Sequence, residues 1–354
     1  MLRSCCWAID LNLITSRDHR ESLQYRHTVV GRAILQHMER VRDIVDTHIH
    51  LASSAFPNDW VDHDLNSDAK SMHSNMALKV DRHKGDLSLE SLVEEIKETC
   101  SSTVKVERMV FVECGNDGGS TEEAKWALSL AADPTSQVCA VVAHIPVPDG
   151  EEAVRIFLSS VASWVSSSSP SMSEILPTAL RGGRVVLLGN PMPPSDACLS
   201  DKYIAGLAVL EEYGLHWEWC CHSSSLFSIA TACSKFPNMT FVLNHCGRNG
   251  GTEDDVDEWK AAIACVAKQQ NVVCKIGAIE EWGVANPHPL LDFVVECFGF
   301  QRVMFESNWF VSKACGFRYD RLVRTAEEAM KRNGATEEDL MDVFCRNAER
   351  VYKL

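Results

Sequence analysis

The sequence predicts an α/β fold, a (β/α)8 (TIM) barrel that is either regular or distorted. Short apolar runs alternate with segments of helical periodicity over residues 41–354. About eight runs separated by helices, in a chain of this length, are typical of that barrel. The runs are almost continuously apolar, as expected for parallel strands buried on both faces. An open doubly wound sheet is the competing arrangement, but it requires a glycine-rich phosphate turn after the first strand, which is missing here.

Each expected strand is a short apolar run, and each expected helix shows apolar residues at helical spacing, as at Leu89, Leu92 and Ile96. The strands are expected at residues 44–51, 109–113, 138–144, 183–188, 215–222, 240–245, 272–276 and 302–308. The helices are expected at 88–100, 120–132, 151–165, 199–213, 224–236, 253–270, 288–298, 318–333 and 336–349. The polar segment 51–87 is too long for an ordinary connection and is typical of a functional loop.

The composition limits the class of protein and its surroundings. A net charge of -15 argues against nucleic-acid binding, since no stripe of basic residues is present to neutralise phosphates. No apolar run approaches the roughly 20 residues of a membrane span. The 15 cysteines form no regular pattern, which favours a reducing compartment such as the cytoplasm over a disulfide framework. We therefore expect a small-molecule substrate, with no nucleic-acid or membrane partner, and the oligomeric state is left open with a homodimer among the options.

Residues 1–40 are expected to form an N-terminal extension to a barrel domain at 41–354. Several arginines in the extension, among them Arg17, Arg20 and Arg26, give it a faint resemblance to a mitochondrial transit peptide, but Asp10 and Asp18 weaken that interpretation.

The first strand ends in ligand-type side chains. Alternation along a strand predicts that Asp46, His48 and His50 lie on one face. Two imidazoles one strand repeat apart can converge on a metal ion or on one polarised carbonyl group. Polar residues recur at the ends of the other expected strands, where barrel enzymes carry their chemistry. They are Glu113, His144, Arg184, His222, His245, Lys275, Glu306 and Asn308.

These landmarks resemble the amidohydrolase superfamily. The stretch from Asp46 to His50 is similar to its DxHxH signature. Residues 236–247 (FPNMTFVLNHCG), 271–276 (NVVCKI) and 298–309 (FGFQRVMFESNW) resemble three segments of the lactonase-type branch. The resemblance covers about residues 44–354 and implies a TIM barrel that hydrolyses a cyclic ester or amide, most often a sugar or dicarboxylate lactone. Water would attack a carbonyl that the strand-end histidines polarise.

One departure from the superfamily pattern affects the expected mechanism. The last strand usually ends in a water-activating Asp within a GSD sequence, whereas this chain has Glu306, Ser307 and Asn308 in that place, as a related sub-branch also does. An amide cannot act as a general base. We therefore expect Glu306 to be the base, with Glu113 as the fallback, His245 as a further catalytic residue, and Asn308 orienting water or substrate. An ion pair with Lys275 is the structural alternative for Glu306.

The resemblance leaves the cofactor open. A mononuclear divalent metal, with zinc favoured, would be held by His48, His50 and His222, with His245 as an optional fourth ligand, and a metal-free site is equally consistent with the branch. A binuclear centre is not expected. Substrate contacts are expected from Arg184, Lys275, His144 and Trp309. Trp217, Trp219, Trp282 and Trp309 would either form stacking walls or pack at the rim.

Three other functions remain as alternatives. A metal-dependent nonoxidative decarboxylase would use the same histidines on an aromatic acid. A non-catalytic ligand-binding relative would explain Asn308 but not the retained histidines. A metal-dependent deoxyribonuclease is less consistent with the segments in the middle of the chain.

Overall fold

A computed structural model describes residues 42–52, 87–102, 104–114, 120–168, 177–188, 193–247, 256–278 and 286–354. The expected extension and most of the expected functional loop lie outside these residues, as does Trp282. Residues 1–41 and 42–354 form separate units, and the description below concerns the second.

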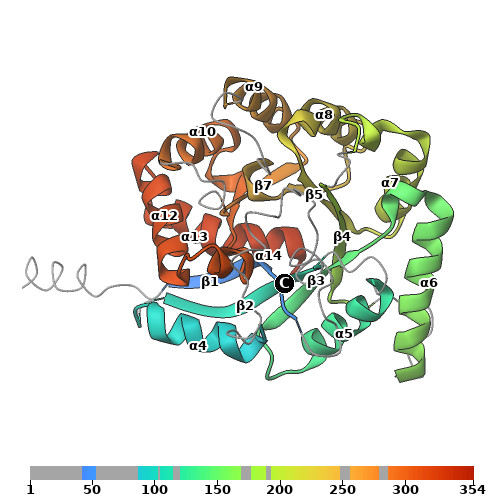
Figure 1. The fold of residues 1–354 in the computed structure, drawn as a ribbon, viewed down its shortest axis with the longest axis horizontal. Helices are drawn as coiled ribbons and strands as arrows, with labels where there is room; N and C mark the ends of the chain where they lie inside the picture. The colour runs from blue at the N-terminus through green and yellow to red at the C-terminus, as the bar shows by residue number, and fades with distance from the viewer. Residues whose placement is uncertain are drawn as a thin grey trace, which may run out of the picture. The chain divides into compact units, whose positions relative to one another are not determined.

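The second unit contains one parallel sheet of eight strands in sequence order, β1 to β8. The expected (β/α)8 barrel is therefore confirmed, and Figure 1 shows the helices arranged around the strands. The strands are β1 (Arg42–Ile49), β2 (Val104–Val112), β3 (Val138–His144), β4 (Leu180–Leu187), β5 (His216–Cys221), β6 (Phe241–Leu243), β7 (Val272–Ile276) and β8 (Val303–Phe305).

The helices follow the strands in alternation. They are α4 (Leu89–Thr99), α5 (Ser120–Ala132), α6 (Glu151–Ser168), α7 (Asp201–Glu212), α8 (Leu226–Ser234), α9 (Val256–Ala267), α10 (His288–Phe298), α11 (Val311–Ala314) and α12 (Tyr319–Arg332). The helix expected at 336–349 is instead α13 (Glu337–Met341), a π-helical turn η9 (Asp342–Arg346) and α14 (Asn347–Tyr352). No helix of the described residues combines the length and the apolarity needed to cross a membrane.

The barrel closes where β1 meets the segment after β8. Ile49 forms a parallel bridge with Trp309, and the backbone N–H of His50 donates to the Trp309 carbonyl at 2.5 Å. The Thr47 hydroxyl donates to the Phe305 carbonyl at 2.6 Å. These contacts are fewer than those of a full ladder, so this seam relies on side chains as well as on backbone pairing.

Most β5 residues alternate between two environments, and this alternation positions the site. Trp217 and Trp219 are fully buried, and both rings contact Tyr203 of α7, so they lie between the sheet and the helices. They are packing residues and do not form stacking walls. Glu218, between them, points into the barrel, where β4 and β5 pair it in register with Arg184. The strand β5 therefore carries apolar residues toward the helices and polar residues toward the barrel interior.

Candidate functional site

The expected strand-end residues come together inside the barrel at the carboxyl ends of its strands. His48 comes from β1 and Arg184 from β4, whereas the other four follow directly after strands. They are His50 after β1, Glu113 after β2, His245 after β6 and Glu306 after β8. All six side chains are almost completely buried. Several predicted strands are shorter than expected, so His245, Glu306 and Asn308 lie just beyond the strands and not within them.

Asp46 does not share the face of the two histidines. The register of β1 shifts between Asp46 and Ile49, which breaks the expected alternation. The Asp46 carboxylate instead accepts from the backbone N–H of Ser307 at 3.0 Å and from the Tyr319 hydroxyl at 2.9 Å. This part of the signature therefore fixes the backbone where β1 meets the segment after β8.

The two imidazoles of β1 meet through their Nε2 atoms, which lie 3.2 Å apart. The Nδ1 atom of His50 faces the Val112 carbonyl at 2.9 Å, and because a carbonyl only accepts, this nitrogen carries the proton. Burial, together with the charge of Arg184, lowers the pKa of His50 to about 3. His50 is therefore neutral, and its Nε2 presents a lone pair to the interior.

Glu306 connects the two histidines that flank it. One carboxylate oxygen lies 3.0 Å from Nδ1 of His48. The other accepts from the backbone N–H of His245 at 2.8 Å and from its Nδ1 at 3.0 Å. A Cβ atom on Gly277, at the end of β7, would lie 2.2 Å from the Glu306 carbonyl oxygen, so only glycine allows this close approach.

The surroundings of His245 and His48 shift the pKa values of the two imidazoles in opposite directions. Although burial opposes it, the neighbouring Glu306 carboxylate raises the pKa of His245 to about 10. Burial, followed by the charges of Lys275, His245 and Arg184, holds the pKa of His48 well below its usual value. The site therefore holds a neutral imidazole beside a protonated one when no substrate is bound.

Arg184 is anchored by Glu113. Its Nε donates to the Glu113 carboxylate at 2.6 Å, and its Nη2 donates to the Glu113 carbonyl, also at 2.6 Å. The remaining group, Nη1, lies 3.0 Å from Nε2 of His48. The ring of His144, also predicted to bind substrate, lies 3.8 Å from Glu113. Glu113 is therefore occupied in holding a cation, and this position is a poor one for a general base.

Lys275 forms its ion pair with Glu218, and not with Glu306, the partner considered as the structural alternative. Its Nζ donates to Glu218 at 2.6 Å and to the Thr47 carbonyl at 2.7 Å, and it lies 3.4 Å from Nδ1 of His48. Asn244 and Tyr352 also donate to Glu218, each at 2.7 Å. Lys275 is fully buried and is held by these protein groups. It therefore acts as a fixed charge beside His48.

Three further predicted residues lie in different surroundings from those expected. The His222 ring turns toward Ser224, whose backbone N–H it caps at 3.2 Å, and so does not join His48 and His50. Trp309 is buried, and its indole N–H donates to Glu95 of α4 at 3.1 Å. Asn308 has a left-handed backbone with φ of 51°, which asparagine adopts more readily than most residues. That conformation starts the turn into α11, whose Ser312 N–H donates to the Asn308 carbonyl at 3.1 Å.

The described residues contain one group that could hold a metal ion, and it differs from the predicted set. It consists of His48, His245 and Glu306, whose ligand atoms lie within 4.8 Å of one another. The predicted partners His50 and His222 are not in it.

The charges around His48 oppose a divalent ion. Lys275 lies 3.4 Å from one ring nitrogen and Arg184 lies 3.0 Å from the other. Each is held by a buried carboxylate, so neither is free to withdraw. A metal ion would need a lone pair of His48, and both of its ring nitrogens already face a fixed cationic group. In this arrangement the site fits a divalent metal poorly.

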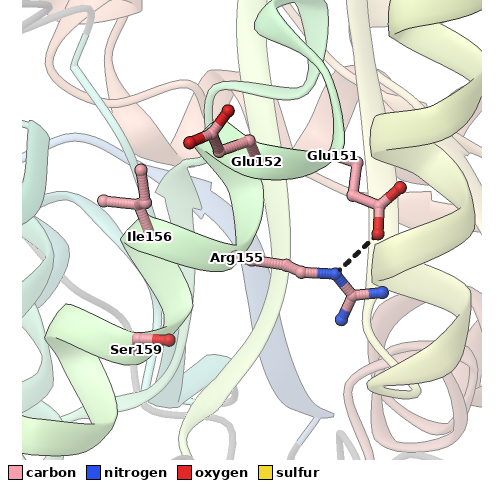
Figure 2. Close-up of a pocket in the computed structure, with 5 residues that line it drawn as sticks. All are labelled: Glu151, Glu152, Arg155, Ile156 and Ser159. Atoms are coloured by element: carbon pink, nitrogen blue, oxygen red, sulfur yellow. Dashed lines mark hydrogen bonds and ion pairs between the residues drawn. The ribbon is translucent and has the colours of Figure 1, made fainter.

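A pocket of about 560 Å³ lies on the surface of α6 and is separate from these residues. Figure 2 shows its lining side chains, with the ion pair between Arg155 and Glu151 at 2.9 Å. The other lining residues are Glu152, Ile156 and Ser159. The pocket holds no histidine and none of the strand-end residues, so it is not the candidate catalytic site.

Sequence reasoning missed Glu218, Asn244 and Cys220, which all face the barrel interior. The signal was present in the alternation of β5, where His216, Glu218 and Cys220 occupy one face and the two tryptophans the other. The residue selected on this strand was His222, which lies one and two repeats beyond Cys220 and Glu218. Asn244 immediately precedes the selected His245.

The fold and the site together define a barrel enzyme whose interior carries imidazoles, carboxylates and one arginine at the carboxyl ends of the strands. The family model described as Amidohydrolase matches residues 117–354. The chain belongs to this family and is a hydrolase.

Individual relatives agree with the lactonase-type branch. L-fucono-1,5-lactonase of Burkholderia multivorans is 26% identical over 218 residues, which cover 56% of this chain and 72% of that protein. The uncharacterized protein y4mH of Sinorhizobium fredii is 26% identical over 112 residues, which cover 30% of this chain and only 38% of the relative. A zinc-bound amidohydrolase structure from Burkholderia multivorans superposes with a TM-score of 0.65 at 20% identity, covering 88% of this chain and 99% of that one.

Proposed function

We propose that the protein hydrolyses a small lactone, adding the elements of water across the acyl carbon–oxygen bond of the ring. The observation that carries the proposal is the pair of His245 and Glu306, joined at 3.0 Å and facing the neutral His48 and the fixed Arg184. The lactonase named among the relatives supports the choice of a cyclic ester.

The roles follow from the contacts. The Nδ1 proton of His245 points to Glu306, so when His245 loses its other proton, the lone pair lies on Nε2. That nitrogen takes a proton from the attacking group and returns it to the ring oxygen as the ring opens. Arg184, held in place by Glu113, supplies positive charge for the carbonyl oxygen as it becomes negative. Glu306 therefore acts through His245 and is not itself the base that contacts water.

The nonoxidative decarboxylase is a weaker alternative. A decarboxylase was expected to use a metal held by the same histidines. In the structure, Lys275 and Arg184 lie against the two ring nitrogens of His48. No contact within the described part of the chain favours decarboxylation over hydrolysis.

The test is a panel of sugar and dicarboxylate lactones assayed by acid release, with and without a chelator. Glu306→Gln keeps the shape of the side chain but loses the charge that orients and polarises His245, so we expect kcat to fall about 100-fold or more. Glu338→Gln, on the exposed surface of α13, is the matched control and should keep the wild-type rate. Because no metal step is expected, the chelator should leave the rate unchanged. Wild-type activity in Glu306→Gln would contradict the proposal.

A further inference from the structure

Glu95 connects helix α4 to the segment that follows β8. One of its carboxylate oxygens accepts from the indole N–H of Trp309 at 3.1 Å and lies 3.0 Å from Nζ of Lys313. The other oxygen accepts from the backbone N–H of Tyr319 at 3.3 Å. The Glu95 side chain is 11% exposed, so it is largely withdrawn from solvent. One carboxylate therefore gathers three donors from residues 309–319.

The carboxylate itself lies outside the catalytic site. Helix α4 runs outside the ring of strands (Figure 1), and Glu95 borders a surface pocket of about 540 Å³ whose lining also includes Lys313. The Lys313 ammonium lies 5.3 Å from the centre of the Trp309 ring, so it contacts both the carboxylate and its indole partner. Any effect of Glu95 on chemistry inside the barrel must therefore pass through the residues that it holds.

Trp309 and the residue after it both contact His50. The backbone carbonyl of Trp309 accepts from the His50 N–H at 2.5 Å, so Trp309 binds Glu95 with its side chain and His50 with its backbone. The buried Phe310 ring meets the imidazole of His50 edge to face, with the ring centres 6.2 Å apart. Nε2 of this imidazole lies 3.2 Å from Nε2 of His48. The placement of Trp309 and Phe310 therefore influences where the His50 ring points.

A second connection reaches the neighbouring histidine through Tyr319. The backbone N–H of Tyr319 donates to Glu95, and its hydroxyl donates to Asp46 at 2.9 Å. Asp46 in turn accepts from the backbone N–H of His48 at 3.2 Å. His48 and His50 are thus both linked to the one carboxylate on α4, each through a different donor of the segment after β8.

We propose that Glu95 is a positioning residue for this site and holds the imidazole of His50 in place through Trp309 and Phe310. Its effect on turnover rests on the function proposed above, whereas its effect on the His50 ring does not. Both oxygens of Glu95 accept, so the shape of the side chain alone is not enough. A glutamine would turn its NH2 group toward either the indole N–H or the Tyr319 N–H, whichever way the amide is oriented. Two donors would then face each other, and the segment would have to shift.

The first experiment follows the His50 ring and needs no turnover. The Nδ1 proton of His50 is held by the Val112 carbonyl at 2.9 Å, and it should give a separate downfield NMR signal that His50→Gln identifies by its loss. Glu95→Gln in the full-length protein should shift and broaden this signal. Trp309→Phe removes the indole donor but leaves the other two donors of Glu95 in place, so it should fold and have the same effect. An unchanged signal in both variants would overturn the proposal.

Asp292→Asn is the matched control, because Asp292 is also a carboxylate that joins two helices. It accepts from Arg332 at 2.9 Å and from Asn333 at 3.4 Å, and so it ties α10 to the end of α12. The loss of such a tie should lower the urea midpoint of either variant, but only Glu95→Gln should move the His50 signal. An equal change of the signal in Asp292→Asn would show that Glu95 only stabilises the fold and would overturn the proposal.

The second experiment measures lactone turnover. Glu95→Gln should lower kcat about 10-fold with KM close to that of wild type, because a displaced imidazole is poorly aligned with the reacting group. Trp309→Phe should do the same, and the double variant should be no slower than the slower single variant, because both changes act through one contact. A wild-type kcat in both single variants would overturn the inference and leave lactone hydrolysis standing. A moved His50 signal in a protein that hydrolyses no lactone would do the reverse.

Discussion

At the scale of single residues, the site is shaped by where each buried charge finds its partner. Glu306 binds His245, Glu218 binds Lys275, and Glu113 binds Arg184, at 3.0, 2.6 and 2.6 Å respectively. Leaving one charge of such a pair without its partner typically costs about 3–5 kcal/mol, so each pairing strongly restricts the others. The arrangement leaves His48 and His50 as neutral groups among fixed charges.

Glu123 of α5 is a buried carboxyl group, with its side chain only 2% exposed. Its oxygens accept weakly from the Cys114 N–H at 3.3 and 3.4 Å. Burial, with the neighbouring charge of Glu113, raises its pKa from 4.5 to about 8. Glu123 is therefore largely protonated in the folded protein at neutral pH and ionised in the unfolded chain.

This difference predicts a pH-dependent stability. The raised pKa means that the folded state binds more protons between pH 4.5 and 8, so the contribution of Glu123 is full below pH 4.5 and is lost as the pH rises to about 8. Glu123→Gln cannot ionise. Its unfolding free energy relative to wild type should therefore rise by on the order of a few kcal/mol across that window, as measured by urea titrations at pH 5 and 8. Glu122→Gln, on the exposed side of the same helix, should show no such trend, and a trend equal in the two variants would contradict the assignment.

The sequence predicted the members of the site better than their partners. Strand-end position was enough to select His48, His245 and Glu306, because parallel strands bring their carboxyl ends to one edge. It could not show that Lys275 donates to Glu218, since that depends on which residue of the neighbouring strands faces inward. The turn of His222 toward Ser224 was equally hidden, because a local cap competes with a distant ligand set.

At the scale of elements, the C-terminal helix α14 packs against the barrel interior. Val351 and Tyr352 pack with inward-facing strand residues such as Val45, Val110 and Val242. The Tyr352 hydroxyl reaches past this apolar layer to donate to Glu218 at 2.7 Å. The helix thus both covers apolar side chains and contributes to the charged network beneath the site.

Tyr352→Phe should therefore lower the free energy of unfolding, because it removes one buried hydroxyl group. Removing the hydroxyl leaves Glu218 one donor short in a fully buried place, which costs about 1–3 kcal/mol. The expected result is a lower urea midpoint with an unchanged slope. Tyr213→Phe, whose side chain is 43% exposed, is the control and should be neutral. An unchanged midpoint for Tyr352→Phe would show that water or another donor replaces the hydroxyl.

Element boundaries were harder to predict than the elements themselves. Apolar runs marked all eight strands, but β6 and β8 stop earlier than the runs because His245 and Asn308 adopt left-handed conformations. The helix expected at 336–349 was predicted as one continuous helix. The structure has a π-helical turn within it, which shifts the helix by a residue and leaves no clear mark in the spacing of apolar residues.

At the scale of the whole barrel, closure depends on Asp46. The carboxylate accepts from Ser307 N–H after β8 and from the Tyr319 hydroxyl of α12, and it also accepts from its own strand at the His48 N–H, at 3.2 Å. Among the residues that the structure describes, backbone pairing across this seam consists of the bridge between Ile49 and Trp309, with the hydrogen bond from the His50 N–H to Trp309. One side chain thus joins the first strand, the last strand and the helix that covers both.

Asp46→Ala should consequently destabilise the barrel as a whole. Three donors lose their acceptor in a site with no solvent access, and each unsatisfied buried group costs about 1–3 kcal/mol, reduced where the backbone can relax. We expect a fall of several kcal/mol in the free energy of unfolding, with far-UV circular dichroism and tryptophan fluorescence changing at the same lower urea concentration, because an opened seam exposes both edges of the sheet. Asp43→Ala, an exposed position on the same strand, is the matched control and should remain near wild type. If Asp46→Ala lost activity while keeping its unfolding midpoint, the residue would serve the chemistry and not the closure. The seam would then be held by the other contacts across it, among them the Ile49–Trp309 bridge, the Thr47 hydroxyl and the Ser307 hydroxyl on the His48 carbonyl.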